Sequence, residues 1–118
     1  MSKIVKKGWG QEVIFASNNK YAGKLLEFKK KGAKFSMHFH ASKTETWYVL
    51  KGSFSLRTID TLTGSINEIT MYPGDVWTNA PLKPHQLQSL EANSTIIEVS
   101  TADTVADNYR VMPGDSQA

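Results

Sequence analysis

The stretch GAKFSMHFHASKTETWYVLKG, residues 32–52, places two histidines two positions apart and a glutamate five residues later, with a glycine at each end. The whole chain contains three histidines, so this one segment holds two of them. Its first half, KFSMHFH, alternates polar and apolar side chains with the period of two that is typical of a β-strand. The segment therefore predicts a strand that presents His38 and His40 to the same space.

The predicted strand over residues 34–40 separates its side chains into two sets, because successive residues point to opposite faces. The two imidazoles start from backbone positions ~7 Å apart, close enough to bind a single ion. One set faces the predicted site and consists of Ser36, His38 and His40. The other set is expected to pack away from that site and consists of Phe35, Met37 and Phe39.

The composition predicts a single globular domain. At 118 residues and 13.1 kDa we expect one domain over residues 1–118, with a loose tail from about Met112. The chain has no cysteine, which excludes disulfides and thiolate ligands. No stretch approaches the ~20 apolar residues of a membrane span, and the N-terminus lacks the apolar centre of a secretory signal. We therefore predict a cytoplasmic protein without a membrane partner.

The charges divide unevenly along the chain. Residues 1–51 contain eleven lysines and three glutamates, a balance of +8, whereas residues 52–118 contain three cations and eight acids, a balance of −5. The basic tract KKKGAK, residues 29–34, is of a kind found in nucleic-acid-binding proteins. It has no interleaved arginine, and the aromatic residues nearby fit alternating strand positions. We therefore interpret it as a solvated edge strand guarded by lysines and predict no nucleic-acid partner.

Short segments rich in β-branched and aromatic residues follow one another along the chain, separated by turn residues such as Gly, Asn, Pro and Asp. This regular spacing is typical of an all-β sandwich or barrel. The predicted strands cover residues 12–16, 24–30, 34–40, 45–52, 53–60, 67–72, 75–80, 85–90 and 94–101.

Glu45 and His85 extend the histidine pair to a candidate metal site. Glu45 shares its strand face with Trp47 and Val49, so its carboxylate enters a largely apolar space that is costly for an unpaired charge. His85 begins another strand after a proline-rich approach. Three neutral imidazoles and one carboxylate suit one divalent transition metal: zinc, iron, manganese, nickel or cobalt. A hydrogen-bonded polar core is the alternative, and a metal site accounts better for the buried glutamate.

These residues resemble the two sequence motifs of the cupin superfamily. The spacing of the first motif is reproduced without a gap by Gly32, His38, His40, Glu45 and Gly52. Gly74 and His85 match the ends of the second motif, although Ala80 and Leu82 stand where the family often has proline and glycine. The resemblance covers essentially the whole chain. It implies an all-β double-stranded β-helix, the cupin jelly-roll barrel of two facing sheets.

A closer resemblance is to the type II mannose-6-phosphate isomerase cupin domain. It rests on three segments, KKGWGQEVIF (6–15), ETWYVLKGSF (45–54) and IIEVSTADTVADNYR (96–110). Carried over residue by residue, the first metal position, often a glutamine in that family, is His38 here. The other three ligands match His40, Glu45 and His85. The candidate catalytic residues are the two cations expected to bind a substrate phosphate, Lys83 and Arg110.

Three functions of different classes are compatible with such a site. The first is metal-assisted aldose–ketose isomerisation of a sugar phosphate or sugar nucleotide, in which a base moves a proton between adjacent carbons. The chain has no spare histidine for that base, so a lysine, a metal-bound water or another acid must supply it. The second function is that of an Fe(II) dioxygenase. The third is non-catalytic carbohydrate binding, with Trp47, Trp77 and Tyr48 as stacking surfaces.

A homodimer is also expected. A small barrel has exposed sheet edges, and a strand such as YAGKLLEF, residues 21–28, favours pairing with a second copy. Cupins often dimerise, so the family resemblance implies the same state.

Overall fold

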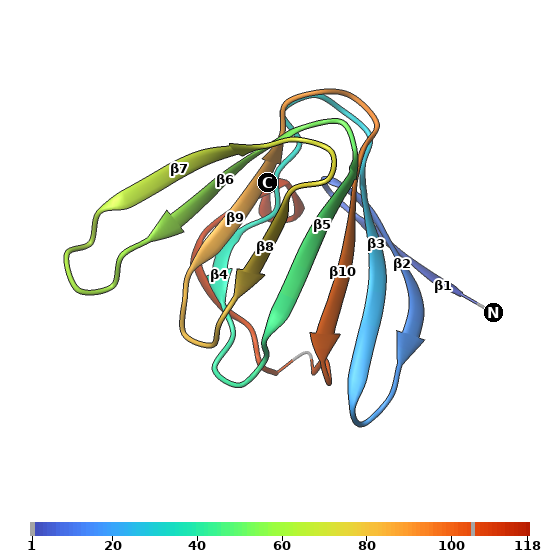
Figure 1. Ribbon diagram of the computed structural model, residues 1–118, viewed down its shortest axis with the longest axis horizontal. Coiled ribbons are helices and arrows are strands. Elements are labelled where there is room, and N and C mark those ends of the chain that lie inside the picture. The colour runs from blue at the N-terminus through green and yellow to red at the C-terminus, as the bar shows by residue number, and fades with distance from the viewer. Residues whose placement is uncertain (1, 105) are drawn as a thin grey trace.

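The computed structural model describes residues 2–104 and 106–118, and for these residues it confirms the all-β prediction. Two antiparallel sheets enclose the core (Figure 1). One sheet has six strands in the order β1-β2-β3-β10-β5-β8, and the other has five in the order β11-β4-β9-β6-β7. The β6–β7 hairpin projects from the body of the barrel, at the left of Figure 1.

Each of the nine predicted strands corresponds to one observed strand. The sequence does not predict β1 and β11, which are short strands close to the two ends of the chain. The six-stranded sheet consists of β1 (Lys3–Lys7), β2 (Gly10–Ser17), β3 (Tyr21–Phe28), β10 (Ser94–Thr101), β5 (Glu45–Lys51) and β8 (Val76–Asn79). The five-stranded sheet consists of β11 (Tyr109–Met112), β4 (Met37–Phe39), β9 (His85–Ser89), β6 (Phe54–Ile59) and β7 (Ile66–Met71). In the part of the chain that the structure describes, no helix is long and apolar enough to cross a membrane.

Aromatic side chains join the two sheets in the core. Trp9 stacks on Phe28 with 4.6 Å between the ring centroids, and Phe28 meets Phe54 of the opposite sheet edge to face at 5.0 Å. Both phenylalanines are fully buried. Burial of a side chain of this size contributes ~1.5–3 kcal/mol. This cluster therefore fixes how the sheets face each other and leaves the neighbouring space between them for polar residues.

The facing predicted for the opening segment is wrong at one position. β4 begins only at Met37, later than predicted, so the strand alternation does not extend back to Phe35. The Phe35 ring joins the core and lies 5.2 Å from the ring of His38, measured between centroids. Phe39 lies on the side away from the histidines and stacks on Tyr109 of β11 at 5.2 Å.

The tail from about Met112, for which the sequence predicts a loose conformation, contacts the body of the barrel in this structure. Gly114 is buried, and a Cβ at this position would overlap the main chain of Phe35. The hydroxyl of Ser116 accepts a hydrogen bond from the backbone N–H of Gly8 at 2.9 Å. A glycine that fits against the main chain thus lets the tail pack on the segment that leads to the histidines.

The lysine tract and the strand β3 differ from what the sequence predicts for them. The lysines of residues 29–31 lie in an exposed turn after β3 and not in an edge strand. β3 itself is hydrogen-bonded on both sides, to β2 and to β10, so its backbone cannot pair with a second copy. The outermost strands of the two sheets are β1, β8, β11 and β7.

Two glycines with nearly the same backbone conformation provide a matched test of packing. Gly52, between β5 and β6, has φ of 77°, and a Cβ there would overlap the side chain of Ser94. Gly64, between β6 and β7, has φ of 76° with open space around it. We expect Gly64→Ala to lower the free energy of unfolding by about 1 kcal/mol through backbone strain alone. Gly52→Ala should lower it by at least about 3 kcal/mol, because overpacking adds to that strain. Urea denaturation measures both, and equal losses would show that space is not limiting at Gly52.

Candidate metal centre

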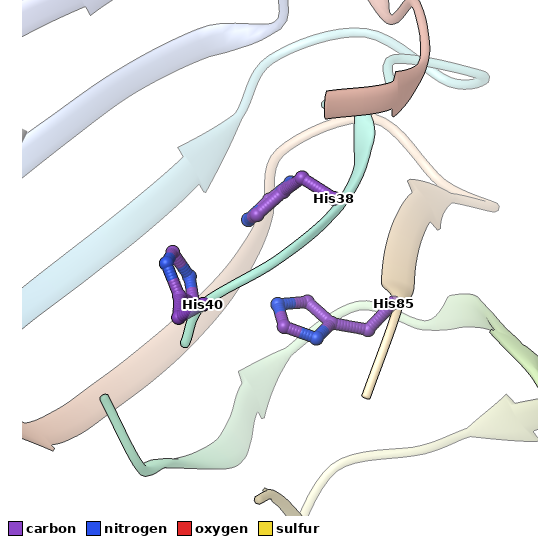
Figure 2. A group of neighbouring side chains, drawn as sticks. All are labelled: His38, His40 and His85. Carbon is purple, nitrogen blue, oxygen red and sulfur yellow. The ribbon is translucent and has the colours of Figure 1, made fainter. Parts of the chain in front are cut away.

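Three histidines meet between the two sheets, and Figure 2 shows their rings gathered in one space. His38 lies in β4, His40 directly follows that strand, and His85 is the first residue of β9. His38 and His85 are register partners across the two strands. One ring nitrogen from each histidine lies within 4.8 Å of those of the other two. The pairing of β4 with β9 therefore brings the third histidine to the two of the opening segment.

Each imidazole is oriented by a main-chain carbonyl group. A carbonyl oxygen can only accept a hydrogen bond, so each Nδ1 is the donor and carries the ring hydrogen. Nε2 then keeps its lone pair and points into the shared space, the usual arrangement of metal-binding histidines. The carbonyl partners are Ser36 for His38 at 2.7 Å, Asp107 for His40 at 2.5 Å, and Lys83 for His85 at 2.8 Å.

Burial keeps two of these rings neutral. Burial and then the neighbouring His85 lower the pKa of His38 to about 3. Burial also lowers the pKa of His40. Only a neutral imidazole can coordinate a metal ion. Both rings of the opening segment are therefore in the ligand form at neutral pH.

Glu45, at the start of β5, lies beside the three rings. Its Oε1 is 2.8 Å from Nε2 of His85 and 3.7 Å from Nε2 of His40. Burial alone would raise the pKa of Glu45, but its contacts with His85 and then Lys43 lower it well below the usual range. The carboxylate is therefore ionised inside the barrel.

The contact between Glu45 and His85 indicates a missing positive charge. With Nδ1 of His85 as the donor to a carbonyl oxygen, a neutral His85 would turn the lone pair of Nε2 toward the ionised oxygen of Glu45, 2.8 Å away. A proton or a metal ion must lie between such atoms. Ligand atoms bound at ~2.0–2.2 Å from one ion lie about 3 Å from each other. Because the Nε2 atoms of His38 and His40 converge on the same space, the donor set fits a divalent metal.

A cluster of charges anchors the far side of Glu45. Nζ of Lys43 lies 3.4 Å from Oε2 of Glu45, 3.7 Å from Oε2 of Glu98 and 3.1 Å from Oδ1 of Asp103. Burial would lower the pKa of Lys43, but these three carboxyl groups raise it above the usual range. The ammonium group therefore stays charged and holds the Glu45 carboxylate in place.

Glu98 of β10 is a site residue that the sequence analysis did not single out. Its Oε1 accepts a hydrogen bond from Nε1 of Trp47 at 2.9 Å, and it lines the same cavity as Glu45. Burial and then the negative charge of Glu45 raise the pKa of Glu98 to about 8. Near neutral pH the two carboxyl groups thus hold one proton, which lies on Glu98. The sequence signal is its inward position in β10, on the same strand face as the buried Ile96.

Asp107 is a second residue that the sequence pattern did not reveal. Its main-chain oxygen orients His40, and its carboxylate caps the loop that leads to Glu45. One residue therefore positions an imidazole and the approach to the carboxylate. The backbone N–H groups that donate to this carboxylate are those of Ala41 at 2.6 Å, Ser42 at 3.1 Å and Lys43 at 3.1 Å.

An open cavity of about 390 Å³ leads to the histidines. Its wall includes His38, His40 and Glu45, together with Arg110, one of the two cations singled out by the sequence. Arg110 lies opposite His38 in the pairing of β11 with β4. Arg110 is therefore close to the candidate metal ligands.

The structure places Lys83 elsewhere. Its side chain lines a second cavity beside Trp77, while only its main-chain carbonyl contributes to the first site, through His85. The exposed cation that joins Arg110 in the wall of the first cavity is Lys7, in β1, whereas Lys24 and Lys43 in the same wall are buried. The sequence could not predict that Lys7, rather than Lys83, lies in the first cavity, because Lys7 belongs to β1, a strand that the pattern did not reveal.

Comparison with solved structures identifies the fold. No protein-family model matches the chain, and no curated protein sequence matches it. KdgF from Halomonas sp. superposes with a TM-score of 0.69 at 22% identity, over 81% of each chain. Oxalate decarboxylase from Bacillus subtilis gives a TM-score of 0.79 at 20% identity, and CapF from Staphylococcus aureus, a capsular polysaccharide assembling protein, gives 0.81 at 15%. These two matches cover 93% and 95% of this chain but only 30% and 33% of theirs. The chain therefore has the double-stranded β-helix fold that its cupin resemblance implies.

We predict that the purified protein binds one divalent transition-metal ion per chain. His85→Ala removes one ligand and should lower the metal affinity at least about tenfold. Lys83→Ala keeps the carbonyl that orients His85 and should leave the affinity unchanged. Elemental analysis gives the stoichiometry, and titration calorimetry gives the affinity. A protein that contains no metal and takes up neither zinc, iron nor manganese would rule out the site.

A second prediction concerns the loop between β4 and β5. Asp107→Ala keeps the carbonyl that orients His40 but removes the carboxylate that caps residues 41–43, so it should lower the metal affinity about tenfold or more by loosening the loop between His40 and Glu45. Asp60→Ala is the matched control, since this carboxylate also caps a turn through the backbone N–H groups of Leu62 and Thr63. Its turn lies in the β6–β7 hairpin, so the control should bind metal normally. Equal affinities of the two variants would show that Asp107 does not position the ligands.

Proposed function

We propose that this chain is a metal-dependent isomerase that interconverts the aldose and ketose forms of a sugar phosphate or sugar nucleotide. The observation that carries the proposal is the convergence of three imidazoles and Glu45 beside a cavity that also contains a titratable acid and cations. The resemblance of three sequence segments to the type II mannose-6-phosphate isomerase cupin domain supports the same reaction. The ion is zinc, iron, manganese, nickel or cobalt, and the Mn(II) centres of oxalate decarboxylase support a metal in this fold.

The charges of the cavity favour an anionic substrate. Lys24 and Lys43 line the cavity, but both form ion pairs with the carboxylate of Asp103, with Nζ–Oδ distances of 2.5 Å and 3.1 Å. Lys7 and Arg110 are exposed and form no ion pair with the described residues. Two unpaired cations can bind a phosphate group, and the planar guanidinium group of Arg110 can do so through two parallel hydrogen bonds.

The reaction requires a base as well as a metal. A divalent ion held by the histidines supplies Lewis-acid polarisation of the substrate carbonyl. A proton must also leave the carbon beside that carbonyl and return to its neighbour. We assign this transfer to Glu98, because a pKa of about 8 lets this carboxyl group both lose and regain a proton near neutral pH, with its ionised form as the base. Lys43 cannot serve, since three carboxyl groups keep it charged.

The placement of the aromatic residues does not favour carbohydrate binding without catalysis. Stacking on a sugar requires exposed rings on one surface. Trp47 is 1% exposed, Tyr48 lies on the outer face of β5, and Trp77 lines the second cavity. An Fe(II) dioxygenase would use the same histidines, so the assay below includes oxygen consumption as an outcome.

With a divalent metal added, the protein should interconvert mannose 6-phosphate and fructose 6-phosphate, or a close pair of sugar phosphates, with solvent deuterium entering at C1 or C2. His40→Ala should abolish this activity by removing a metal ligand. Glu98→Gln should lower kcat about 10²–10⁴-fold with unchanged metal content. Arg110→Ala should mainly raise KM, by a factor that corresponds to about 1–3 kcal/mol. Lys29→Ala, an exposed cation outside the cavity, is the control for Arg110→Ala.

Neither turnover nor deuterium exchange with any sugar phosphate or nucleotide sugar, at full metal occupancy, would reject the isomerase. Oxygen consumption by the Fe(II) form would then identify a dioxygenase. Full activity of Glu98→Gln would leave the reaction intact but reject Glu98 as its base.

A further inference from the structure

A continuous row of apolar side chains crosses all six strands of the larger sheet. The row follows the strand register, in which each residue is the partner of the next across the sheet. Three of its members are exposed by 43% or more, and the other three are half-buried. In the order of the strands, this apolar row consists of Ile4, Val13, Leu25, Ile97, Tyr48 and Val76.

The apolar row lies on the outer face of the sheet. Strand neighbours of its members, such as Leu26, Ile96 and Trp47, point inward and are buried in the core. An antiparallel sheet with one face in water normally carries polar residues on that face. A sheet that is apolar on both faces needs a cover on each side, and here one face has none within the described chain.

The positions along one side of the row are also uncharged. The Phe15 ring lies over Gly23, where a Cβ would overlap it, and the 52% exposed Val99 is the next residue across the sheet. These positions form a second row parallel to the apolar row, and Thr46 and Thr78 continue it across β5 and β8. The hydroxyl groups of the two threonines form a 2.9 Å hydrogen bond with each other. Charged side chains border only the opposite side of the apolar row, at Lys6, Glu27 and Lys51.

We infer that a second copy of this chain covers the outer face, with the two apolar rows packed against each other about a twofold axis. Such an isologous contact places the same patch on both sides, so a patch can face itself only if it carries little charge. The first half of the chain has a balance of +8, and of its eleven lysines none lies in either row. This face is therefore a place where two basic copies can meet without repulsion.

The dimensions of the face agree with this partner. Six strands ~4.8 Å apart span about 29 Å, and two rows that each occupy two residues of ~3.3 Å span about 13 Å, which gives roughly 400 Å² in projection. Standard interfaces bury about 800 Å² of accessible surface per partner, with an apolar core inside a polar rim. The two rows fit such a core. The hydrogen-bonded chain from Lys6 through Gln11 to Glu27 fits the rim.

The proposed dimer leaves the candidate metal centre accessible. Trp47 and Glu98 line the cavity from the inner face, whereas their neighbours Tyr48 and Ile97 belong to the apolar row. Adjacent residues in β5 and β10 thus serve opposite faces of one sheet. The dimer can therefore be tested independently of the isomerase, because neither depends on the other.

Sedimentation equilibrium at micromolar concentration tests the interface. The unmodified protein should have the mass of two 13.1 kDa chains. Tyr48→Lys places like charges at the centre of the contact and should raise the dimer dissociation constant by about a hundredfold or more. Ile69→Lys, at a residue of β7 that is 44% exposed compared with 43% for Tyr48, is the control and should remain dimeric. A monomeric unmodified protein, a dimeric Tyr48→Lys or a monomeric Ile69→Lys would each reject this interface.

Single cysteines provide a second measurement that does not depend on the folding of Tyr48→Lys. The chain has no cysteine of its own, so an introduced thiol is the only one that reacts with a maleimide. Val99→Cys lies beside the apolar row and should be protected, whereas Thr70→Cys, on the exposed strand β7, should react at the rate of a free thiol. Equal rates at micromolar concentration would show that the outer face is uncovered.

Discussion

The candidate site depends on one constraint, which is that the Nε2 atoms of three imidazoles, two of them buried, and an oxygen of Glu45 point into the same small volume. Atoms with this polarity repel each other unless a positive charge lies among them. The fold maintains the arrangement from several directions. The pairing of β4 with β9 places His38 opposite His85, and main-chain carbonyls orient every ring. β4 is only three residues long, and β11 and the C-terminal tail pack against it and the segment before it.

The charges behind Glu45 follow from the same constraint. An ionised carboxylate inside a barrel costs several kcal/mol of solvation unless partners offset that cost. Lys43 supplies one offsetting charge, but a second buried carboxyl group, Glu98, shares that lysine and cannot ionise as easily. This competition for Lys43 moves the pKa values of the two acids apart, since the pKa of Glu45 is lowered and that of Glu98 is raised. An acid that can release a proton near neutral pH therefore arises from the way the structure holds Glu45, a candidate metal ligand.

The sequence predicted the strands, the fold and the residues that meet at the site because these features have a short-range signal. Alternation with a period of two located nine strands, and the spacing of glycines and histidines indicated the cupin barrel. Features that depend on contacts between distant segments had no such signal. Asp107 acts on His40 from an irregular segment, and Gly114 fixes the tail by fitting against the main chain of Phe35. Lys83 illustrates the opposite error, because closeness in sequence to His85 did not place its side chain in the same cavity.

The two faces of the six-stranded sheet explain why its register must be strictly held. In β10 the buried Glu98 lies between Ile97 and Val99 of the outer face, and in β5 Trp47 precedes Tyr48. A slip of β10 by one residue would move Ile97 into the polar cavity and Glu98 onto the apolar outer face. Both changes are unfavourable, since Ile97 would place an apolar side chain among polar groups and Glu98 would lose Lys43 and lie within the apolar row. The polar cavity and the apolar outer face therefore favour the same strand register. A slip that disturbs one face also disturbs the other.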